Sequence, residues 1–365
     1  MAHGRLPGDL YSTLQNLPSL AHLELEGCEI PPYFSPNPAA PIPVTTLTMS
    51  ESVARTYLDP KLDDLEETLE LNLIDDLQII PFTCLLPNLR ELTTDDIDVE
   101  LPSGVPAQLT SFTLNLPYCS GNQSTLNAVL QGMPNLAHLS VSISSSTQYD
   151  SSAPVSTQPQ PSVSLPSLRT LSVPWPAAGY ILPGALLMHL RVTSPIPTTG
   201  AALSVLERPF GTGAPVRDAA LYLHTWDDEV ILAATRCLPD CEALEIVSQH
   251  GAPSDKFLFD LGIQHLPLLQ NLKTLGVFAC PPPPPPPTLP TRRWIQVDLM
   301  SDDEDEEEPP AMSEAERQRA RQRELERAAN EQECVRVWAR YNRHLGRVQL
   351  GGLEAEVRTW LRDTE

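Results

Sequence analysis

Residues 17–30 of the chain read LPSLAHLELEGCEI, and the spacing of their apolar residues decides the predicted fold. Leucines stand at positions 17, 20, 23 and 25, and a cysteine follows at position 28. This spacing fits neither the period of a helix nor the strict alternation of a strand over the whole stretch. The last two leucines fit a short strand that points both side chains to the same side. The stretch therefore predicts a turn that leads into a short, half-buried strand.

The same spacing recurs along the chain. Clear copies are LPNLREL at 86–92, MPNLAHLSV at 133–141, LPSLRTLSV at 165–173 and LQNLKTLGVFAC at 269–280. Weaker copies fill the intervals, and the central apolar pairs begin at 23, 47, 71, 92, 112, 139, 171, 190, 221, 244 and 275. These are about eleven irregular units with a mean spacing of about 25 residues, within the range of roughly 20–29 residues that is typical of leucine-rich repeats. One unit cannot bury its own leucines, so neighbouring units must stack.

The predicted class is therefore α/β: a leucine-rich-repeat solenoid with one short parallel strand per repeat and an irregular convex side. The solenoid covers residues 1–280, a polyproline and acidic linker covers 281–312, and a helical tail covers 313–365. Ser313 and Glu316 form a capping box that begins a helix, and Gly346 ends it. A second amphipathic helix is expected to carry Leu353, Val357, Trp360 and Leu361 on one side. We expect the tail to cover the last repeat.

The LPxLxxLxV units, the proline-rich connections and the cysteine after the strand resemble the repeat half of F-box/leucine-rich-repeat proteins, particularly the fungal ones. In that family the repeats bind a substrate, and an N-terminal F-box docks on a cullin ubiquitin ligase through its adaptor subunit. Here LPGD at 6–9 leads directly into the first repeat, so the resemblance covers the repeat region only and no F-box is visible. The resemblance implies the substrate-recognition part of an F-box-like ligase adaptor. The alternative is a free-standing intracellular scaffold protein without a ligase.

A protein partner is expected on the concave face, where the residues beside the inward leucines point outward. Tyr, Trp and Arg are the residue types enriched at the energetic centres of interfaces, and the late units carry more of them than the early ones. The predicted partner-binding residues are Trp175, Arg191, Tyr222, His224, Trp226 and Phe278. For the aromatic residues, the two tryptophans first and then Tyr222, packing against the connecting loops is the alternative.

The linker carries two further candidate binding segments. The seven prolines at 281–287 fit a stiff spacer or a ligand for a polyproline-binding domain. The segment IQVDLMSDDEDEEE at 295–308 resembles a SUMO-interacting motif, in which Ile295, Val297 and Leu299 would add a strand to the modifier. The alternative for this segment is a solvated acidic linker.

Composition excludes several classes of function. The chain has 24 Lys and Arg against 47 Asp and Glu, a formal net charge of −23, so it would repel nucleic acid and anionic lipid. No run of apolar residues suggests a signal peptide or a membrane span, and the 7 scattered cysteines favour reduced thiols. We therefore expect a cytoplasmic or nuclear protein. No nucleotide-binding, hydrolase or metalloprotease motif appears. The expectation is a binding protein without catalytic, metal or cofactor sites.

Overall fold

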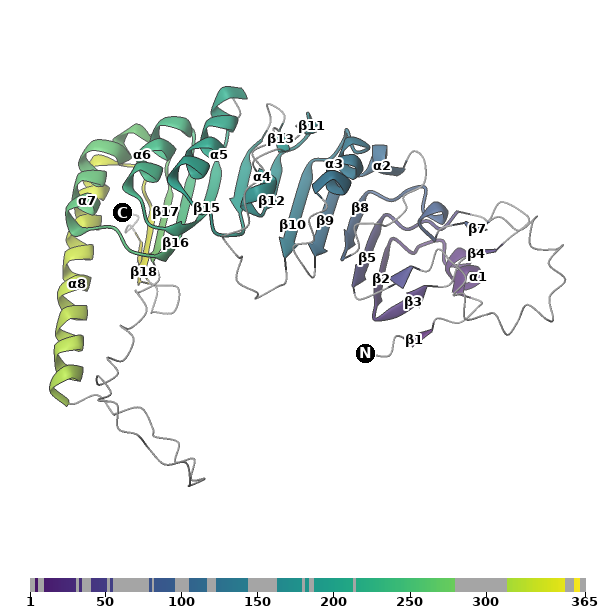
Figure 1. The fold of residues 1–365 in the computed structure, drawn as a ribbon, viewed down its shortest axis with the longest axis horizontal. Coiled ribbons are helices and arrows are strands. Elements are labelled where there is room, and N and C mark those ends of the chain that lie inside the picture. The colour runs from purple at the N-terminus through teal and green to yellow at the C-terminus, as the bar shows by residue number, and fades with distance from the viewer. Residues whose placement is uncertain are drawn as a thin grey trace, which may run out of the picture.

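A single open sheet dominates the molecule (Figure 1). The computed structural model describes residues 4–5, 10–30, 33–34, 41–50, 53–54, 79–80, 82–95, 105–116, 123–143, 163–178, 181–183, 187–212, 215–279, 314–351 and 358–361. Within them, 12 strands form one sheet in the order β19-β18-β17-β16-β15-β14-β12-β10-β9-β8-β5-β2. All neighbouring pairs are parallel except β18 and β19. The prediction of an α/β fold with parallel strands is confirmed at this level.

The strands of this sheet are short and follow one another in chain order. Their bounds are β2 (His22–Glu26), β5 (Thr46–Ser50), β8 (Glu91–Thr94), β9 (Ser111–Leu116), β10 (His138–Ile143), β12 (Thr170–Val173), β14 (His189–Val192), β15 (Asp218–Thr225), β16 (Ala243–His250), β17 (Thr274–Ala279), β18 (Arg347–Gly351) and β19 (Arg358–Leu361). Minor strand pairs join β1 (Gly4–Arg5), β3 (Cys28–Ile30) and β6 (Val53–Ala54); β4 (Tyr33–Phe34) and β7 (Ile79–Ile80); and β11 (Val163–Leu165) and β13 (Ile181–Pro183).

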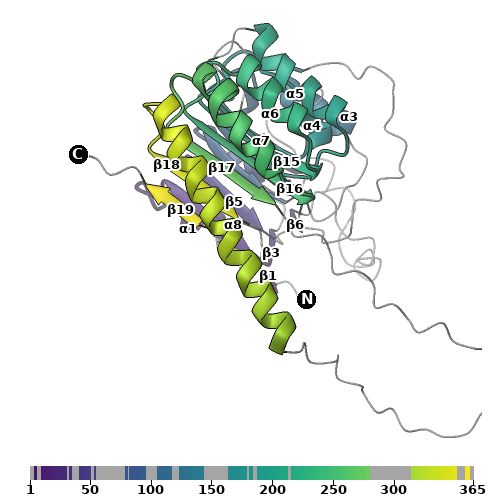
Figure 2. The same ribbon diagram turned by 90° about the vertical axis from the view of Figure 1, so that its left-hand side faces the viewer.

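Helices connect the strands and cover one face of the sheet. Figures 1 and 2 show α2 to α7 along this face, whereas α8 covers the end of the sheet near β17 and β18. We call the opposite face the open face. The helices are α1 (Leu10–Gln15), α2 (Val105–Gln108), α3 (Gln123–Gln131), α4 (Trp175–Ala178), α5 (Thr199–Thr212), α6 (Asp228–Cys237), α7 (Asp255–Asp260) and α8 (Glu314–Tyr341). No helix in the described part of the chain is long and apolar enough to cross a bilayer.

A backbone ladder runs along the amino edge of the sheet. The carbonyl oxygen before each strand accepts hydrogen bonds from two consecutive amide groups of the next strand: Ala21 O accepts from the amides of Thr45 and Thr46, at 2.9 and 3.0 Å. The pattern repeats without a gap from β2 to β18. Its acceptor carbonyls belong to Ala21, Thr45, Arg90, Thr110, Ala137, Arg169, Met188, Arg217, Glu242 and Lys273. The same backbone geometry therefore recurs in every unit.

The predicted leucines fill the core between the sheet and the connections. The turn before a strand buries two of them: Leu272 donates its amide to Leu269 O at 3.1 Å, and both side chains are fully buried. The strand buries the next ones, and these align in one row. The row contains Leu23, Leu47, Leu92, Phe112, Leu139, Leu171, Leu190, Ala219, Leu244, Leu275 and Val348.

One position in this row departs from the predicted register. Ala219, and not Leu221, is the residue that aligns with Leu190 and Leu244. The amides of Arg217 and Asp218 bond to Met188 O, so β15 begins one inward position earlier than its leucines suggest. Leu221 is also buried and points inward one position further along the strand. The predicted unit at Leu71 lies outside the described residues.

The described part of the C-terminal tail consists of one long helix and two short strands. The predicted first helix is confirmed as α8, but the predicted second helix is wrong where the structure describes it, because Arg358–Leu361 forms β19. Leu345, Val348 and Leu350 repeat the apolar spacing of the earlier units, and Gly346 and Arg347 bond to Lys273 O. In Arg358–Leu361, pairing with β18 therefore outweighs the helical spacing of the apolar residues.

The tail is anchored by two buried side chains, one in α8 and one directly after it. The Trp338 indole is fully buried and donates to Leu258 O at 2.8 Å. It lies against Gly262 in the π-helical turn Leu261–His265, where any Cβ atom would overlap the indole ring. Asn342 donates to the carbonyl oxygens of Leu266 and Leu269, at 3.2 and 2.9 Å. These contacts fix α8 onto the unit that ends in β17.

Candidate functional site

The open face changes in character along the sheet. Between β5 and β12 it carries small hydroxyl groups, of which Ser142 donates to Asn115 Oδ1 at 2.6 Å and Thr46 donates to Glu91 Oε2 at 3.2 Å. We call this region the hydroxyl region. Its residues are Thr46, Thr48, Ser50, Thr93, Ser111, Thr113, Ser140, Ser142, Thr170 and Ser172. The large apolar side chains that define the next region lie further along this face, on β15 to β17.

The structure brings four of the six predicted binding residues together. Arg191 on β14, Tyr222 and His224 on β15, and Phe278 on β17 all occupy outward positions of neighbouring strands. Tyr222 aligns with Val247, and Val247 aligns with Phe278. The three side chains therefore form an apolar row across β15, β16 and β17.

Val247 and Glu245 were missed by the sequence analysis. The signal was present, since Leu244 and Ile246 are the inward residues of β16 and the residues beside them must point outward. We call Arg191, Tyr222, Glu245, Val247 and Phe278 the open-face patch.

Two small residues let the patch lie flat on the sheet. A Cβ atom on Gly276 would come within 2.8 Å of Phe278 Cε2, so the ring lies over the glycine that precedes it on the same face. Ala220 stands in register between Arg191 and Glu245. Across it, Arg191 Nη2 reaches Glu245 Oε2 at 3.7 Å. Both partners of this ion pair are more than two-fifths exposed, so it orients the side chains and adds little stability.

His224 borders the patch toward the carboxyl edge of the sheet. Its Nδ1 atom lies 2.9 Å from Gln249 Oε1, and its ring meets that of His250 edge to face, with centroids 4.9 Å apart. The imidazole is thus held between two neighbours on β16. It is positioned to form the polar rim of the apolar row.

The two predicted tryptophans lie elsewhere. Trp175 begins α4, where its amide donates to the Ser194 hydroxyl oxygen at 3.0 Å and its half-buried ring packs against the core. The Trp226 indole donates to Asp228 Oδ1 at 2.7 Å and meets the Phe257 ring edge to face. Both lie in connections between strands and helices, because the chain turns toward the helical face directly after β12 and β15.

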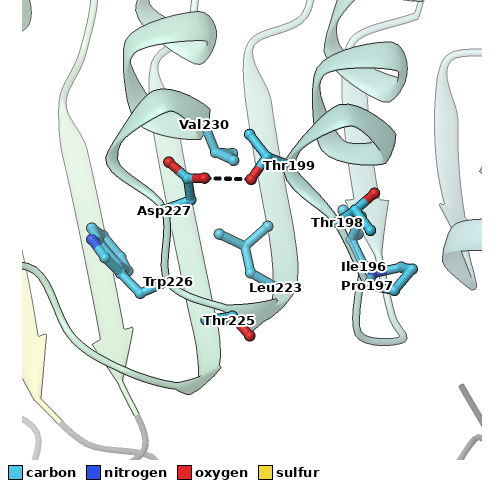
Figure 3. A pocket seen from close by; sticks show the side chains of 9 residues that line it. All are labelled: Ile196, Pro197, Thr198, Thr199, Leu223, Thr225, Trp226, Asp227 and Val230. Carbon is cyan, nitrogen blue, oxygen red and sulfur yellow. Dashed lines mark hydrogen bonds between the residues drawn. The ribbon is translucent and has the colours of Figure 1, made fainter.

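A cavity of about 250 Å³ opens at the carboxyl edge of the sheet, between the connections that follow β14 and β15. Figure 3 shows Asp227 and Thr199 facing each other across it, while the Trp226 ring turns away. The Thr199 hydroxyl donates to Asp227 Oδ2, and Asp227 Oδ1 accepts from the amide of Glu229 at 2.9 Å. The residues that line the cavity are Ile196, Pro197, Thr198, Thr199, Leu223, Thr225, Trp226, Asp227 and Val230. The sequence analysis did not identify this cavity, since its walls come from two loops without a motif.

Two of the described cysteines, Cys241 and Cys334, are buried. Cys241 takes the place of a leucine in the turn before β16, with its amide bonded to Leu238 O at 3.1 Å. Burial raises the pKa of its thiol to about 12, so it stays protonated. Burial likewise raises the pKa of Cys334. Among the described residues, no three His, Cys, Asp or Glu side chains are grouped so that they could hold a metal ion.

The predicted SUMO-interacting residues Ile295, Val297 and Leu299 and the prolines at 281–287 lie outside the described residues. Comparisons with known proteins add no assignment: no protein-family model matches the chain, and no curated protein matches it in sequence.

Proposed function

We propose that this protein is a leucine-rich-repeat solenoid that recognises another protein through the open-face patch. The observation that carries the proposal is the apolar row of Tyr222, Val247 and Phe278, half-exposed on an otherwise polar face and held in register by three parallel strands. The proposal gives the chain a binding role and no catalytic one.

The repeat assignment rests on the recurrence of backbone geometry. The ladder of paired amide hydrogen bonds, the turn between two buried leucines and the inward row recur from unit to unit. Stacked units of this kind bury a continuous core, although each contacts only its neighbours. The sheet face that the helices do not cover then offers an extended surface to a partner.

The binding assignment rests on preorganisation. Ordering flexible side chains costs roughly 0.5–1.5 kcal/mol for each one that an interface immobilises. Phe278 already lies against Gly276, and Arg191 already contacts Glu245. A partner would therefore meet a patch whose shape is set before binding, with a tyrosine and an arginine among its members.

Capture of partners by the tagged full-length chain tests this proposal. Replacing Tyr222 and Phe278 with Ala should reduce recovery of the main partner at least tenfold, with an unchanged melting temperature. The matched control replaces Thr113 and Ser140 with Ala, two outward residues of the hydroxyl region. Equal loss in both variants, or no loss in the first, would contradict the proposal.

The resemblance to F-box/leucine-rich-repeat proteins supports a narrower form. In this form the recognised protein is a substrate for ubiquitination, and the chain acts in the cytoplasm or nucleus with a cullin ligase adaptor. The second candidate is a scaffold that works without a ligase. Quantitative mass spectrometry of the purified complex separates them: the adaptor and cullin are enriched only in the first case.

The linker motifs support further partners for the same chain. A SUMO protein would bind at 295–308, and a polyproline-binding domain at 281–287. The full-length chain should lose SUMO binding when Val297 and Leu299 become Ala. Retained binding would leave this segment as an acidic linker.

A further inference from the structure

The cavity between the β14–α5 and β15–α6 connections has the composition of a small binding site. Its apolar walls are Ile196, Pro197, Leu223 and Val230, and its polar side chains are those of Thr198, Thr199, Thr225 and Asp227. Cavities at the carboxyl edge of parallel sheets, with apolar walls and few polar groups, are the usual location for ligands in α/β proteins. The open-face patch lies on the other face of β15, so the two surfaces are separate.

The polar atoms in the cavity are mostly acceptors. The Thr199 hydroxyl group donates its hydrogen to Asp227 Oδ2, so the threonine oxygen can only accept further hydrogen bonds. The Thr198 hydroxyl oxygen accepts from the amide of Ala201 at 3.2 Å. Asp227 contributes a carboxylate with lone pairs beyond its two existing bonds. A ligand that fits these groups brings hydrogen-bond donors.

The charge of the surroundings favours a cation over an anion. The N-termini of α5 and α6 lie at the cavity and carry roughly half a positive charge each. Against them stand the carboxylates of Asp227, Asp228 and Glu229, and that of Asp227 forms part of the wall. Among the described residues that line the cavity there is no Lys, Arg or His.

We infer that this cavity is a binding site for a primary ammonium group on a short alkyl chain, supplied by a lysine side chain of a protein. An ammonium group carries three donors and no acceptor, which matches Asp227, Thr198 and Thr199. Its methylene stem would contact Leu223 and Val230, since lysine buries its stem along apolar surface and keeps its charge among polar groups. The cavity opens beside the exposed residues Thr198 and Thr225, so a side chain can enter from solvent.

Saturation-transfer NMR on the full-length protein tests this inference with matched probes. Nα-acetyl-lysine methylamide supplies the lysine side chain, and Nα-acetyl-norleucine methylamide supplies the same stem without the ammonium group. The lysine probe should bind at least fivefold more tightly than the norleucine probe. A ratio near one would overturn the inference.

Asp227→Asn is the decisive variant. Asn remains a good N-cap for α6, with its Oδ1 accepting from the Glu229 amide, and its Nδ2 takes the place of Asp227 Oδ2 and donates to the Thr199 hydroxyl oxygen, so the fold is kept while the charge is lost. The preference for the lysine probe should fall to about one in this variant. It should persist in Asp240→Asn, which removes the same charge from an exposed turn past the other end of α6. Preference retained in Asp227→Asn would overturn the inference.

A third probe distinguishes the source of the ammonium group. n-Butylammonium offers the same chemistry as a free small molecule. Equal or tighter binding of the lysine methylamide supports a lysine in a polypeptide. Tenfold tighter binding of n-butylammonium would assign the cavity to a free amine and overturn the lysine assignment. None of these results depends on the open-face patch, so failure here leaves the proposed function standing.

Discussion

The hydroxyl region and the open-face patch lie on the same sheet, yet their side chains differ in kind. Both stand on the same backbone ladder, and both cover a row of buried apolar residues. The hydroxyl region presents Thr and Ser, whereas the patch presents Tyr, Val, Phe and an Arg–Glu ion pair. The backbone therefore does not distinguish the two regions. What differs is the outward residue at each position, and the C-terminal half ends in a long docked helix, α8.

The largest expected effect tests whether the C-terminal half depends on α8. Trp338→Ala should lower the free energy of unfolding by about 3–5 kcal/mol, because it removes a fully buried indole and its hydrogen bond to Leu258 O. Chemical denaturation measures the loss. Hydrogen exchange should show earlier opening of β16 and β17 than of β9 and β10; uniform opening would mean that the two halves unfold as one.

A second substitution serves as the control for this site. Gly262→Ala should be strongly destabilising in the wild-type chain, since the added Cβ would overlap the indole. In the Trp338→Ala background the same methyl group enters the vacated space. The two changes should then be clearly less than additive, by about 0.5–3 kcal/mol.

An intermediate effect sharpens the role of the patch. Gly276→Ala places a Cβ atom against Phe278, so the ring must move off the sheet. We expect a loss of about 1–3 kcal/mol in stability together with weaker capture of the partner. In a Phe278→Ala chain the same substitution should cost little. A full loss in that background would show that the backbone, and not the ring, requires glycine.

The smallest expected effect on stability concerns Glu242, at the amino edge of the sheet. A hydrogen bond from Lys273, together with the charges of Lys273 and Arg217, lowers the pKa of the Glu242 carboxyl below its usual 4.5. A carboxyl with a lowered folded-state pKa stabilises the protein above its unfolded-state pKa, and this contribution is lost as the pH falls through the folded-state value. Glu242→Gln should therefore lower the melting temperature slightly at pH 7 and leave it unchanged at pH 2. A pH-independent difference would show that the shape of the side chain matters more than its charge.

The positions of most strands could be predicted from the sequence because each unit carries its own apolar spacing. Leu23, Leu139 and Leu275 needed no long-range information to be placed inward. Ala219 was missed because alanine is a weak apolar signal, and because the start of β15 is set by bonds to Met188, a residue of another unit. Strand β19 was missed for a related reason: its apolar residues fit a helix, and only the free edge of β18 makes them a strand.

The binding residues were predictable in part. Tyr222 and Phe278 follow from alternation along a strand whose inward residues are known. The flattening of the patch by Ala220 and Gly276 could not be foreseen, since it depends on which side chains stand next to each other across strands. The placement of the tryptophans and the cavity beside Asp227 also depend on how two loops meet.

The rungs of the amino-edge ladder are made of backbone atoms alone, and each rung joins only adjacent strands. A unit needs only a carbonyl oxygen, two amides and an inward apolar pair to fit between two neighbours. Such a unit can therefore stand at any position in the order of the strands. Loss or duplication of a whole unit would therefore leave the units on either side with matching partners. Over evolutionary time, we expect such a chain to change the number of its units more readily than their internal design.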